Sequence, residues 1–459
     1  MSTRLALSAV IVGNVAALMG MVPVAAVLPT LASEFRLSVQ DASLVMTAFL
    51  LMVAALVLIA GRLGDLLGYR QVFSAGVVLY TAGALLSALA AEFWQLIASR
   101  ALSGVGVALL TGTSAAIIIS VVSADRRGRA LSLLTMAGPA GSVIGVGLAP
   151  FILANLSWRW IFLMIAPLAL LSLVAARGIP AAPPAAGRRV DVPGGLLLFG
   201  ALAAFSLSFN HFHDGPDTFE DGWTWHVPTH VLATALFLAF LWTERRMAQP
   251  LLDVRVLRER AIAISVGCHG VVHMTMLAAV FLVPFFVQNA LGLTPAHVAI
   301  VIVVTNGLAS VSSLLGGWVW DRLRSPLVRP VCMAVLATGL LLTAIWVPYL
   351  TFTTFLALQV MLGLGMGVAN TLNYTIALGA SPGDQRGFVT GLLETTRQTG
   401  HTLAVVLAAA VLGAGRADGT ALLQSFQVAW LLFGLIAAGG ALLAALPQRQ
   451  PEPVRARTA

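Results

Sequence analysis

Long apolar runs separated by short polar segments make up most of the chain. The hydrocarbon core of a bilayer is about 30 Å thick, so a helix needs roughly 20 apolar residues to cross it. Runs of about that length cover residues 5–33, 42–61, 71–91, 101–124, 130–158, 160–176, 192–213, 222–243, 261–320, 330–383, 387–415 and 419–448. Two of them are long enough for two helices each, dividing near residues 289–295 and 348–351. The pattern predicts an all-α polytopic membrane protein with 14 transmembrane helices.

The positions of the arginines predict the orientation. If the N-terminus is cytoplasmic, alternation places 21 arginines in inside segments and 3 in outside segments. Cytoplasmic loops of membrane proteins carry such an excess of basic residues. Omitting one helix would destroy the asymmetry, so it also supports the helix count. We expect a multi-pass protein with both termini in the cytoplasm.

Composition narrows the class of protein further. Hydrophobic residues make up 59% of the chain and charged residues 10%, with a mean hydropathy of +0.94. These values exclude a soluble globular enzyme and a disordered chain. The net charge of +8 sits in short loops and forms no basic stripe with interleaved aromatics, so nucleic acid is not an expected partner. All basic residues are arginine, which is typical of a GC-rich bacterial genome and favours the bacterial cytoplasmic (inner) membrane.

A weak internal repeat divides the chain into two similar halves. Gly61-x-x-x-Asp65 follows the second predicted helix, and Gly317-x-x-x-Asp321 follows the tenth. A second loop motif lies 60 residues after Asp65 and recurs 63 residues after Asp321. Such duplication is typical of secondary transporters, which bind substrate between the halves. We therefore predict a six-helix bundle at 1–190, two inserted helices at 191–250, and a second six-helix bundle at 251–459.

Several motifs resemble those of the major facilitator superfamily. GRLGDLLGYRQVF at 61–73 is similar to the family's loop signature GxLaDrxGrrxxL. RALSGVGVA at 100–108, SWRWIF at 157–162 and GLLETTRQTG at 391–400 resemble further motifs, the last two those of the fourteen-helix drug:proton antiporter branch. Two departures weaken the match to that branch. Gly20 stands where its first helix usually has an aspartate, and GVGLAP at 145–150 replaces its GPxxGG.

The resemblance implies a conformational latch in the loop after the second helix. The family uses this loop to hold the helix equivalent to the thirteenth predicted here. A carboxylate near the N-terminus of that helix is stabilised by the helix dipole, by about 0.3–1 kcal/mol. The expected latch residues are Gly61, Asp65, Gly68, Arg70, Asp321 and Arg322.

Three charged residues lie inside predicted spans, where each costs about 2.5–3.5 kcal/mol. Glu394 and Arg397 are three residues apart, so they share a helix face and can pair. The pair is either structural or a proton-titrating site. Arg100 is either an anchor near the outer interface or, as the resemblance implies, part of proton movement or substrate contact.

Uncharged polar residues in the spans have competing interpretations. His273 is either a neutral imidazole bonded to a neighbouring helix or a proton carrier, and with His269 it forms an HxxxH pair too poor in ligands for a metal site. Asn14 and Asn370 fit interhelical hydrogen bonding. If the family's arrangement holds, Asn14, Arg100, His273 and Asn370 line the cavity. The candidate proton-coupling residues are Glu394, Arg397, Arg100 and His273.

These features together predict a secondary active transporter that works by alternating access. No GxxxxGK[ST] loop is present, so ATP is not the expected energy source, and we expect no cofactor. We expect proton-coupled, multidrug-type efflux of hydrophobic neutral or monocationic small molecules, by a monomer in the lipid bilayer. The alternatives are a metabolite symporter or uniporter of the same fold and, third, a membrane-embedded enzyme, for which convergent catalytic residues are missing.

Overall fold

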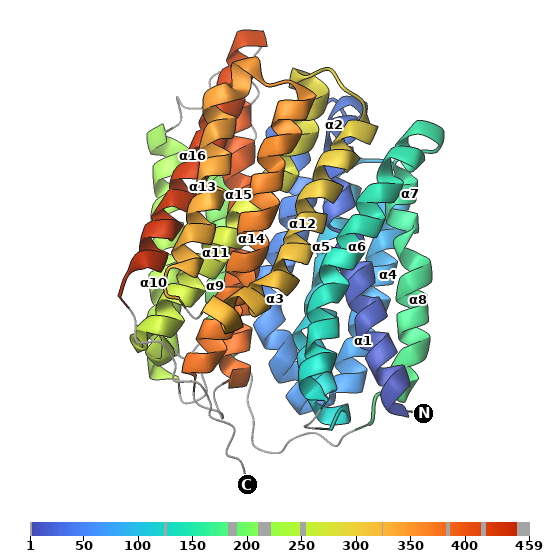
Figure 1. Cartoon of the computed structure of the whole chain (residues 1–459). Coiled ribbons are helices and arrows are strands. Elements are labelled where there is room, and N and C mark those ends of the chain that lie inside the picture. The colour runs from blue at the N-terminus through green and yellow to red at the C-terminus, as the bar shows by residue number, and fades with distance from the viewer. Residues whose placement is uncertain are drawn as a thin grey trace.

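The structure is a computed structural model of a helical bundle (Figure 1). It describes residues 2–123, 126–181, 191–209, 222–247, 254–323, 325–381, 386–414 and 419–447. Every regular element in these ranges is helical. Apolar helices satisfy their backbone hydrogen bonds internally, which is what a chain in lipid requires.

The N-terminal part forms six spans, of which the first and sixth are each broken into two helices. The helices are α1 (Ser2–Met19), α2 (Val22–Glu34), α3 (Val39–Leu67), α4 (Tyr69–Leu89), α5 (Phe93–Val121), α6 (Arg127–Asn155), α7 (Arg159–Leu163) and α8 (Ile165–Ala175), followed by the 3-10 turn η1 (Ala176–Gly178). A turn at Gly20 and Met21 separates α1 from α2. Pro23, in the first turn of α2, lacks the N–H that would continue the helix.

Two helices follow that pack on each other, and the first of them also packs against α3 and α15. These are α9 (Val192–Phe209) and α10 (Val227–Arg246), the latter preceded by the π-helical turn η2 (Gly222–His226). Asp191 begins α9 by accepting a hydrogen bond from the backbone N–H of Gly194 at 2.8 Å. They occupy the positions of the helices expected at 192–213 and 222–243, and the division of the chain into two bundles and an insertion stays a prediction.

The C-terminal part forms another six spans. Its elements are η3 (Val254–Arg258), α11 (Arg260–Phe285), η4 (Phe286–Ala290), α12 (Pro295–Leu323), α13 (Val328–Trp346), η5 (Val347–Tyr349), α14 (Phe352–Ala380), α15 (Arg386–Ala414) and α16 (Gly419–Ala445). The expected divisions of the two longest runs are confirmed, because η4 ends at Ala290 before α12 and η5 separates α13 from α14.

All fourteen predicted helices are found in the described part of the chain. Twelve stretches are long and apolar enough to cross a membrane, and α9 and α15 fill the remaining two places. The fourth span begins at Phe93, so Arg100 lies inside α5, as expected from the sequence. Glu92 and Gln95 form the capping box at the start of this helix.

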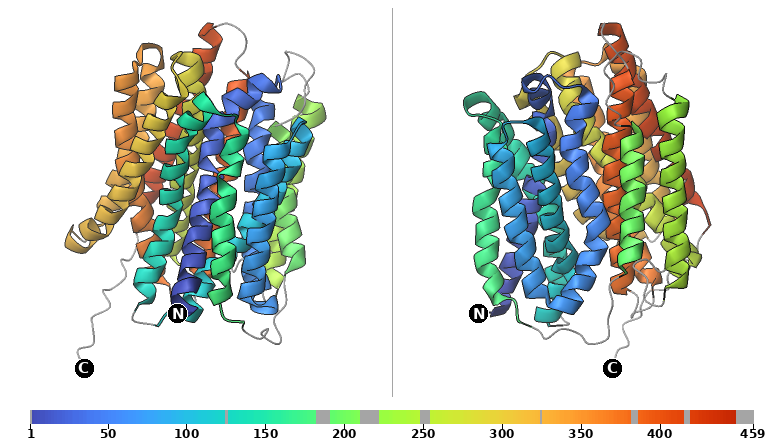
Figure 2. Two further views of the ribbon diagram at one scale, coloured as in Figure 1. Left: turned by 90° about the vertical axis from the view of Figure 1, so that its right-hand side faces the viewer. Right: turned by 180° about the vertical axis from the view of Figure 1, so that it is seen from behind.

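The two halves pack against each other mainly through α3 against α15 and α6 against α12. The second part of the first span, α2, also packs against α11, and Gln40 at the start of α3 lies against Gly413 near the end of α15. At the end where α1 begins, the lower ends of α12 and α13 diverge from α1 and α6 (Figure 2, left).

Candidate functional site

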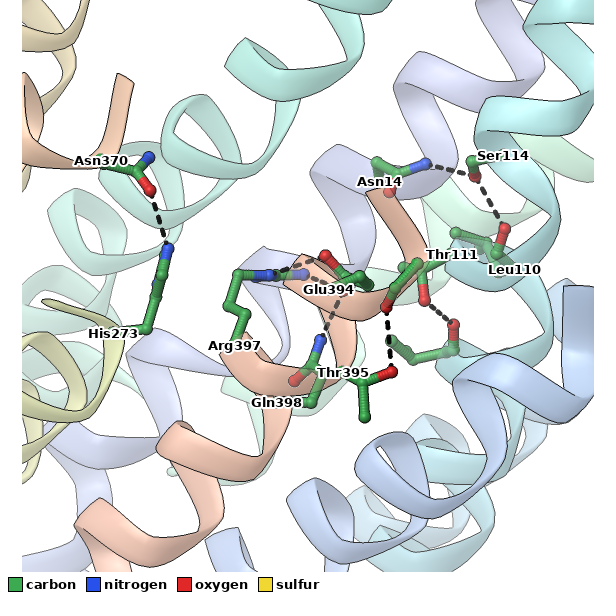
Figure 3. Close-up of polar contacts among 12 residues, drawn as sticks. Asn14, Leu110, Thr111, Ser114, His273, Asn370, Glu394, Thr395, Arg397 and Gln398 are labelled. Atoms are coloured by element: carbon green, nitrogen blue, oxygen red, sulfur yellow. Dashed lines mark hydrogen bonds and ion pairs between the residues drawn. The ribbon is translucent and has the colours of Figure 1, made fainter. Parts of the chain in front are cut away.

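Glu394 and Arg397 form the expected ion pair on α15. Arg397 Nε donates to Glu394 Oε2 at 2.9 Å, and Arg397 Nη2 donates to Glu394 Oε1. Gln398 Nε2 adds a third hydrogen bond to Glu394 Oε1 at 3.0 Å. Figure 3 shows all three side chains grouped on one face of the helix. The carboxylate is thus held by a guanidinium fork and an amide.

The pair is accessible to water-sized molecules although it lies within a span. The Glu394 and Arg397 side chains are 23% and 19% exposed. A buried ion pair is tolerated only when its partners satisfy each other's hydrogen bonds, as they do here. A proton added to Glu394 would cancel the charge that holds Arg397. The geometry can therefore convert one protonation event into the release of a cationic side chain.

His273 of α11 bonds to α14, the neighbouring helix. Its Nε2 lies 3.1 Å from Asn370 Oδ1, and the residue is 7% exposed. This contact is the interhelical hydrogen bond expected of a neutral histidine, and it gives Asn370 a partner as well (Figure 3). A role for His273 in carrying protons stays a prediction.

Two further aromatic rings, which the sequence analysis did not select, lie beside His273 and His269. His401 of α15 has its ring centroid 5.3 Å from that of His273, and Tyr374 of α14 lies 4.9 Å from His269. His401 follows Arg397 by four residues, so the i,i+4 spacing on the helix of the ion pair was the available signal. The sequence interpretation instead paired histidines only within one helix.

Asn14 connects the first and fourth spans of the N-terminal half. Its Nδ2 donates to Ser114 Oγ of α5 at 2.8 Å and to the carbonyl of Val10 at 2.8 Å. The expected interhelical hydrogen bond is therefore present, and the side chain is 8% exposed. Whether Asn14 contacts substrate stays a prediction.

Arg100 lies apart from the Glu394 group. Its Nε donates to the carbonyl of Val45 at 3.2 Å, and its guanidinium lies 4.3 Å from the ring centroid of Phe49 and 5.7 Å from that of Phe162. Only 1% of the residue is exposed. Aromatic faces stabilise such a cation. Arg100 is therefore buried among α3, α5 and α7. Its hydrogen bond and ring contacts are with Val45, Phe49 and Phe162, and none of these is a candidate site residue.

Gly20 stands where the family usually has an aspartate. A tyrosine from α4 fills the space beside it. The Tyr80 hydroxyl donates to the carbonyl of Ala16 at 2.7 Å. A Cβ atom on residue 20 would lie 2.0 Å from that hydroxyl and 2.8 Å from a methyl carbon of Ile165. Both distances are too short for a side chain larger than glycine's. In this structure the first span thus has no space for an acid at this point.

The candidate latch is a tight turn between α3 and α4. Gly68 has φ +94°, a conformation that favours glycine, and the Tyr69 hydroxyl donates to the Asp65 carboxylate. Gly61 lies where α3 passes the backbone of α5, and Arg70 is half-buried in the first turn of α4. These contacts form the turn, but the residues just before α15 lie outside the described part. The latch against α15 therefore stays a prediction.

The corresponding loop in the second half is described only in part. Arg322 is exposed at the end of α12, with its guanidinium 5.6 Å from the ring centroid of Trp318. The side chain of Asp321 lies outside the described residues. The structure thus places Arg322 at the bundle end where α12 diverges and leaves the role of this repeat as a prediction.

Comparisons with known proteins identify the family. The model of the Major Facilitator Superfamily matches residues 10–324 and, in a second match, 262–459. Similar proteins include the putative multidrug resistance protein MdtD of Klebsiella pneumoniae (26% identity; 84% of this chain, 81% of the relative). The puromycin resistance protein pur8 of Streptomyces alboniger is 28% identical over 83% of this chain and 76% of its own. The riboflavin transporter RibZ of Clostridioides difficile is 23% identical, covering 82% and 80%.

Solved structures share the fold. A bacterial homologue of the human lysosomal transporter Spinster, in an inward-facing and unoccupied conformation, gives a TM-score of 0.69 at 15% identity, covering 96% of this chain and 97% of that one. A D-xylose–proton symporter gives 0.66 at 13% identity, covering 98% of each chain. The family match extends over nearly the whole chain and the helix arrangement agrees with it. The chain belongs to the Major Facilitator Superfamily.

Proposed function

We propose that this protein exports hydrophobic neutral or monocationic small molecules in exchange for entering protons, by alternating access. The observation that carries the proposal is the Glu394–Arg397 pair. It places a titratable carboxylate inside a span, and both side chains of the pair are about one-fifth exposed. The similarity to multidrug and puromycin resistance proteins supports the substrate class. The similarity to a riboflavin transporter keeps metabolite transport as the second candidate.

The exchange follows from the charge state of Glu394. With Glu394 ionised, the pair is neutral and Arg397 is held at 2.9 Å. A proton from outside neutralises the carboxylate and weakens its hold on Arg397. The site then presents the uncompensated positive charge of Arg397 to the substrate. Release of the proton to the cytoplasm restores the pair. A single acid of this kind suits neutral or singly charged substrates better than multiply cationic ones.

Movement of the two halves would give the proton access to each side in turn. The packing of α2 against α11, together with the divergence of α12 and α13 from α1 and α6 at the end where α1 starts, supports an inward-facing state. We propose that residues 1–190 and 251–459 rock against each other, with the helices at 191–250 on the periphery. We further propose a monomer in the bacterial inner membrane, with both termini in the cytoplasm.

Transport into proteoliposomes tests this proposal. Proteoliposomes that contain the purified protein should accumulate ethidium, a hydrophobic monocation, when a pH gradient is imposed. An uncoupler should abolish that accumulation. Equilibrium counterflow of ethidium without a gradient should persist. Counterflow that is unaffected by any pH gradient would indicate a uniporter instead. Counterflow of riboflavin but not of ethidium would favour the metabolite candidate.

A further inference from the structure

Three histidines from two helices gather beside the Glu394–Arg397 pair. The ring centroids of His269 and His273, both on α11, are 4.5 Å apart, and that of His401 on α15 is 5.3 Å from His273. His269 and His401 are fully buried and His273 nearly so. We call His269, His273 and His401 the histidine cluster.

Glycines at the crossing of α11 and α15 bring the cluster together. A Cβ atom on Gly400 would lie 2.9 Å from the carbonyl oxygen of Gly270, and one on Gly270 would lie 2.8 Å from a methyl carbon of Thr396. Small residues allow membrane helices to approach this closely. The histidines flank these glycines in sequence, so close packing of the two backbones places the three rings in contact.

The hydrogen bonding of the cluster differs from that of ordinary buried histidines. His273 Nε2 has Asn370 as its partner, but His273 Nδ1 and both ring nitrogens of His269 and His401 have no partner within the described part of the chain. Buried polar atoms are nearly always paired, so five unpartnered nitrogens in one place need an explanation. A neutral imidazole has one nitrogen lone pair that can accept a proton. The cluster thus offers three proton acceptors.

The two charged side chains that interact with the cluster both belong to α15. Each ring interacts electrostatically with Arg397, and His273 also interacts with Glu394. From α14, the neighbouring polar side chains are Asn370 and Tyr374. Among the described residues, no group of three or more His, Cys, Asp or Glu side chains is placed to hold a metal ion. The ion pair is therefore the charged site that faces the cluster.

We propose that the histidine cluster is a second station for the transported proton, and this assignment rests on the proton coupling proposed above. The carboxylic O–H of Glu394 gives up its proton, and a ring-nitrogen lone pair of the cluster accepts it. Total charge is unchanged, and the Glu394 carboxylate regains its ion pair with Arg397. Two positive charges at ring distances of 4.5–5.3 Å repel each other, so the cluster holds one proton at a time.

His401→Gln tests the relay, with His297→Gln as the matched control. His297 lies near the start of α12, bonded to Thr294 at 2.9 Å, and belongs to no part of the cluster. In proteoliposomes, His401→Gln should reduce pH-driven ethidium accumulation about tenfold and shift its pH profile. Counterflow without a gradient should stay within twofold of wild type. His297→Gln should match wild type in both assays.

Gly400→Ala provides a second test that removes no titratable group. It should separate the two helices and reproduce the loss of pH-driven transport, whereas Gly439→Ala, whose Cβ would meet open space, should not. Unchanged pH-driven transport in His401→Gln would overturn the relay, and so would equal loss of driven transport and counterflow in monodisperse protein. A wild type without pH-driven transport would instead refute the proposed coupling itself.

Discussion

Removing the Glu394 carboxylate should destabilise the protein mainly through the partners that it leaves behind. Glu394→Ala takes away the acceptor of three hydrogen bonds, two from Arg397 and one from Gln398. A buried donor without an acceptor costs about 1–3 kcal/mol, and breaking a fully buried ion pair costs about 3–5 kcal/mol. Because the pair is about one-fifth exposed, water recovers part of that cost. We expect a loss of about 3 kcal/mol in the free energy of unfolding.

A double-mutant cycle separates the pair from its surroundings. Arg397→Ala alone leaves an uncompensated carboxylate and should destabilise the protein by a similar amount. The double variant Glu394→Ala/Arg397→Ala removes both charges, so its loss should be smaller than the sum of the two single losses by about 2 kcal/mol.

Thermal unfolding of the purified variants in one detergent measures the cycle. The melting temperature should fall from the wild type to each single variant and only slightly further in the double variant, by much less than additive losses would give. Losses that simply add would refute the reasoning, because they would mean that the two side chains do not stabilise each other. The pair could then not act as a charge-sensitive switch.

Three further predictions concern other parts of the molecule. Asp65→Asn keeps an acceptor for the Tyr69 hydroxyl but removes the charge, so we expect normal insertion and at least fivefold slower ethidium counterflow; a normal rate would leave Asp65 as an ordinary turn residue. Gly20→Asp should destabilise the protein by roughly 1–3 kcal/mol, and the double variant Gly20→Asp/Tyr80→Phe should recover part of that loss. An unchanged melting temperature in Gly20→Asp would show that Tyr80 moves aside freely. A reporter fused after Gly215 should appear outside the cell; a cytoplasmic signal would mean that the helix count before it is wrong by one.

Much of the fold could be predicted from the sequence, because crossing a bilayer imposes a length and a hydropathy on each helix. Runs such as 42–61 and 71–91 therefore located α3 and α4. Arg100 was expected inside the fourth span, but the Phe49 ring that stabilises this cation comes from another helix and has no signal in the local sequence. The break in the first span depends on the turn at Gly20, which hydropathy does not register.

The candidate site was predictable only where its residues share a helix. Glu394 and Arg397 could be paired from their spacing, since i,i+3 neighbours lie on one face. His401 needed the crossing of α11 and α15, which depends on Gly270 and Gly400, residues far apart in sequence. The filling of the space at Gly20 by Tyr80 likewise joins two helices. Such contacts follow from packing between helices, and the local sequence shows only that His401 shares a helix face with Arg397.

The most direct test of proton coupling compares driven and downhill transport in Glu394→Gln. Glutamine keeps the size of the side chain and an acceptor for Arg397 but cannot bind and release a proton near neutral pH. Reconstituted Glu394→Gln should lose pH-driven accumulation of ethidium by at least tenfold while retaining counterflow near the wild-type rate. Full pH-driven accumulation in this variant would contradict the account and make Glu394 a structural partner of Arg397.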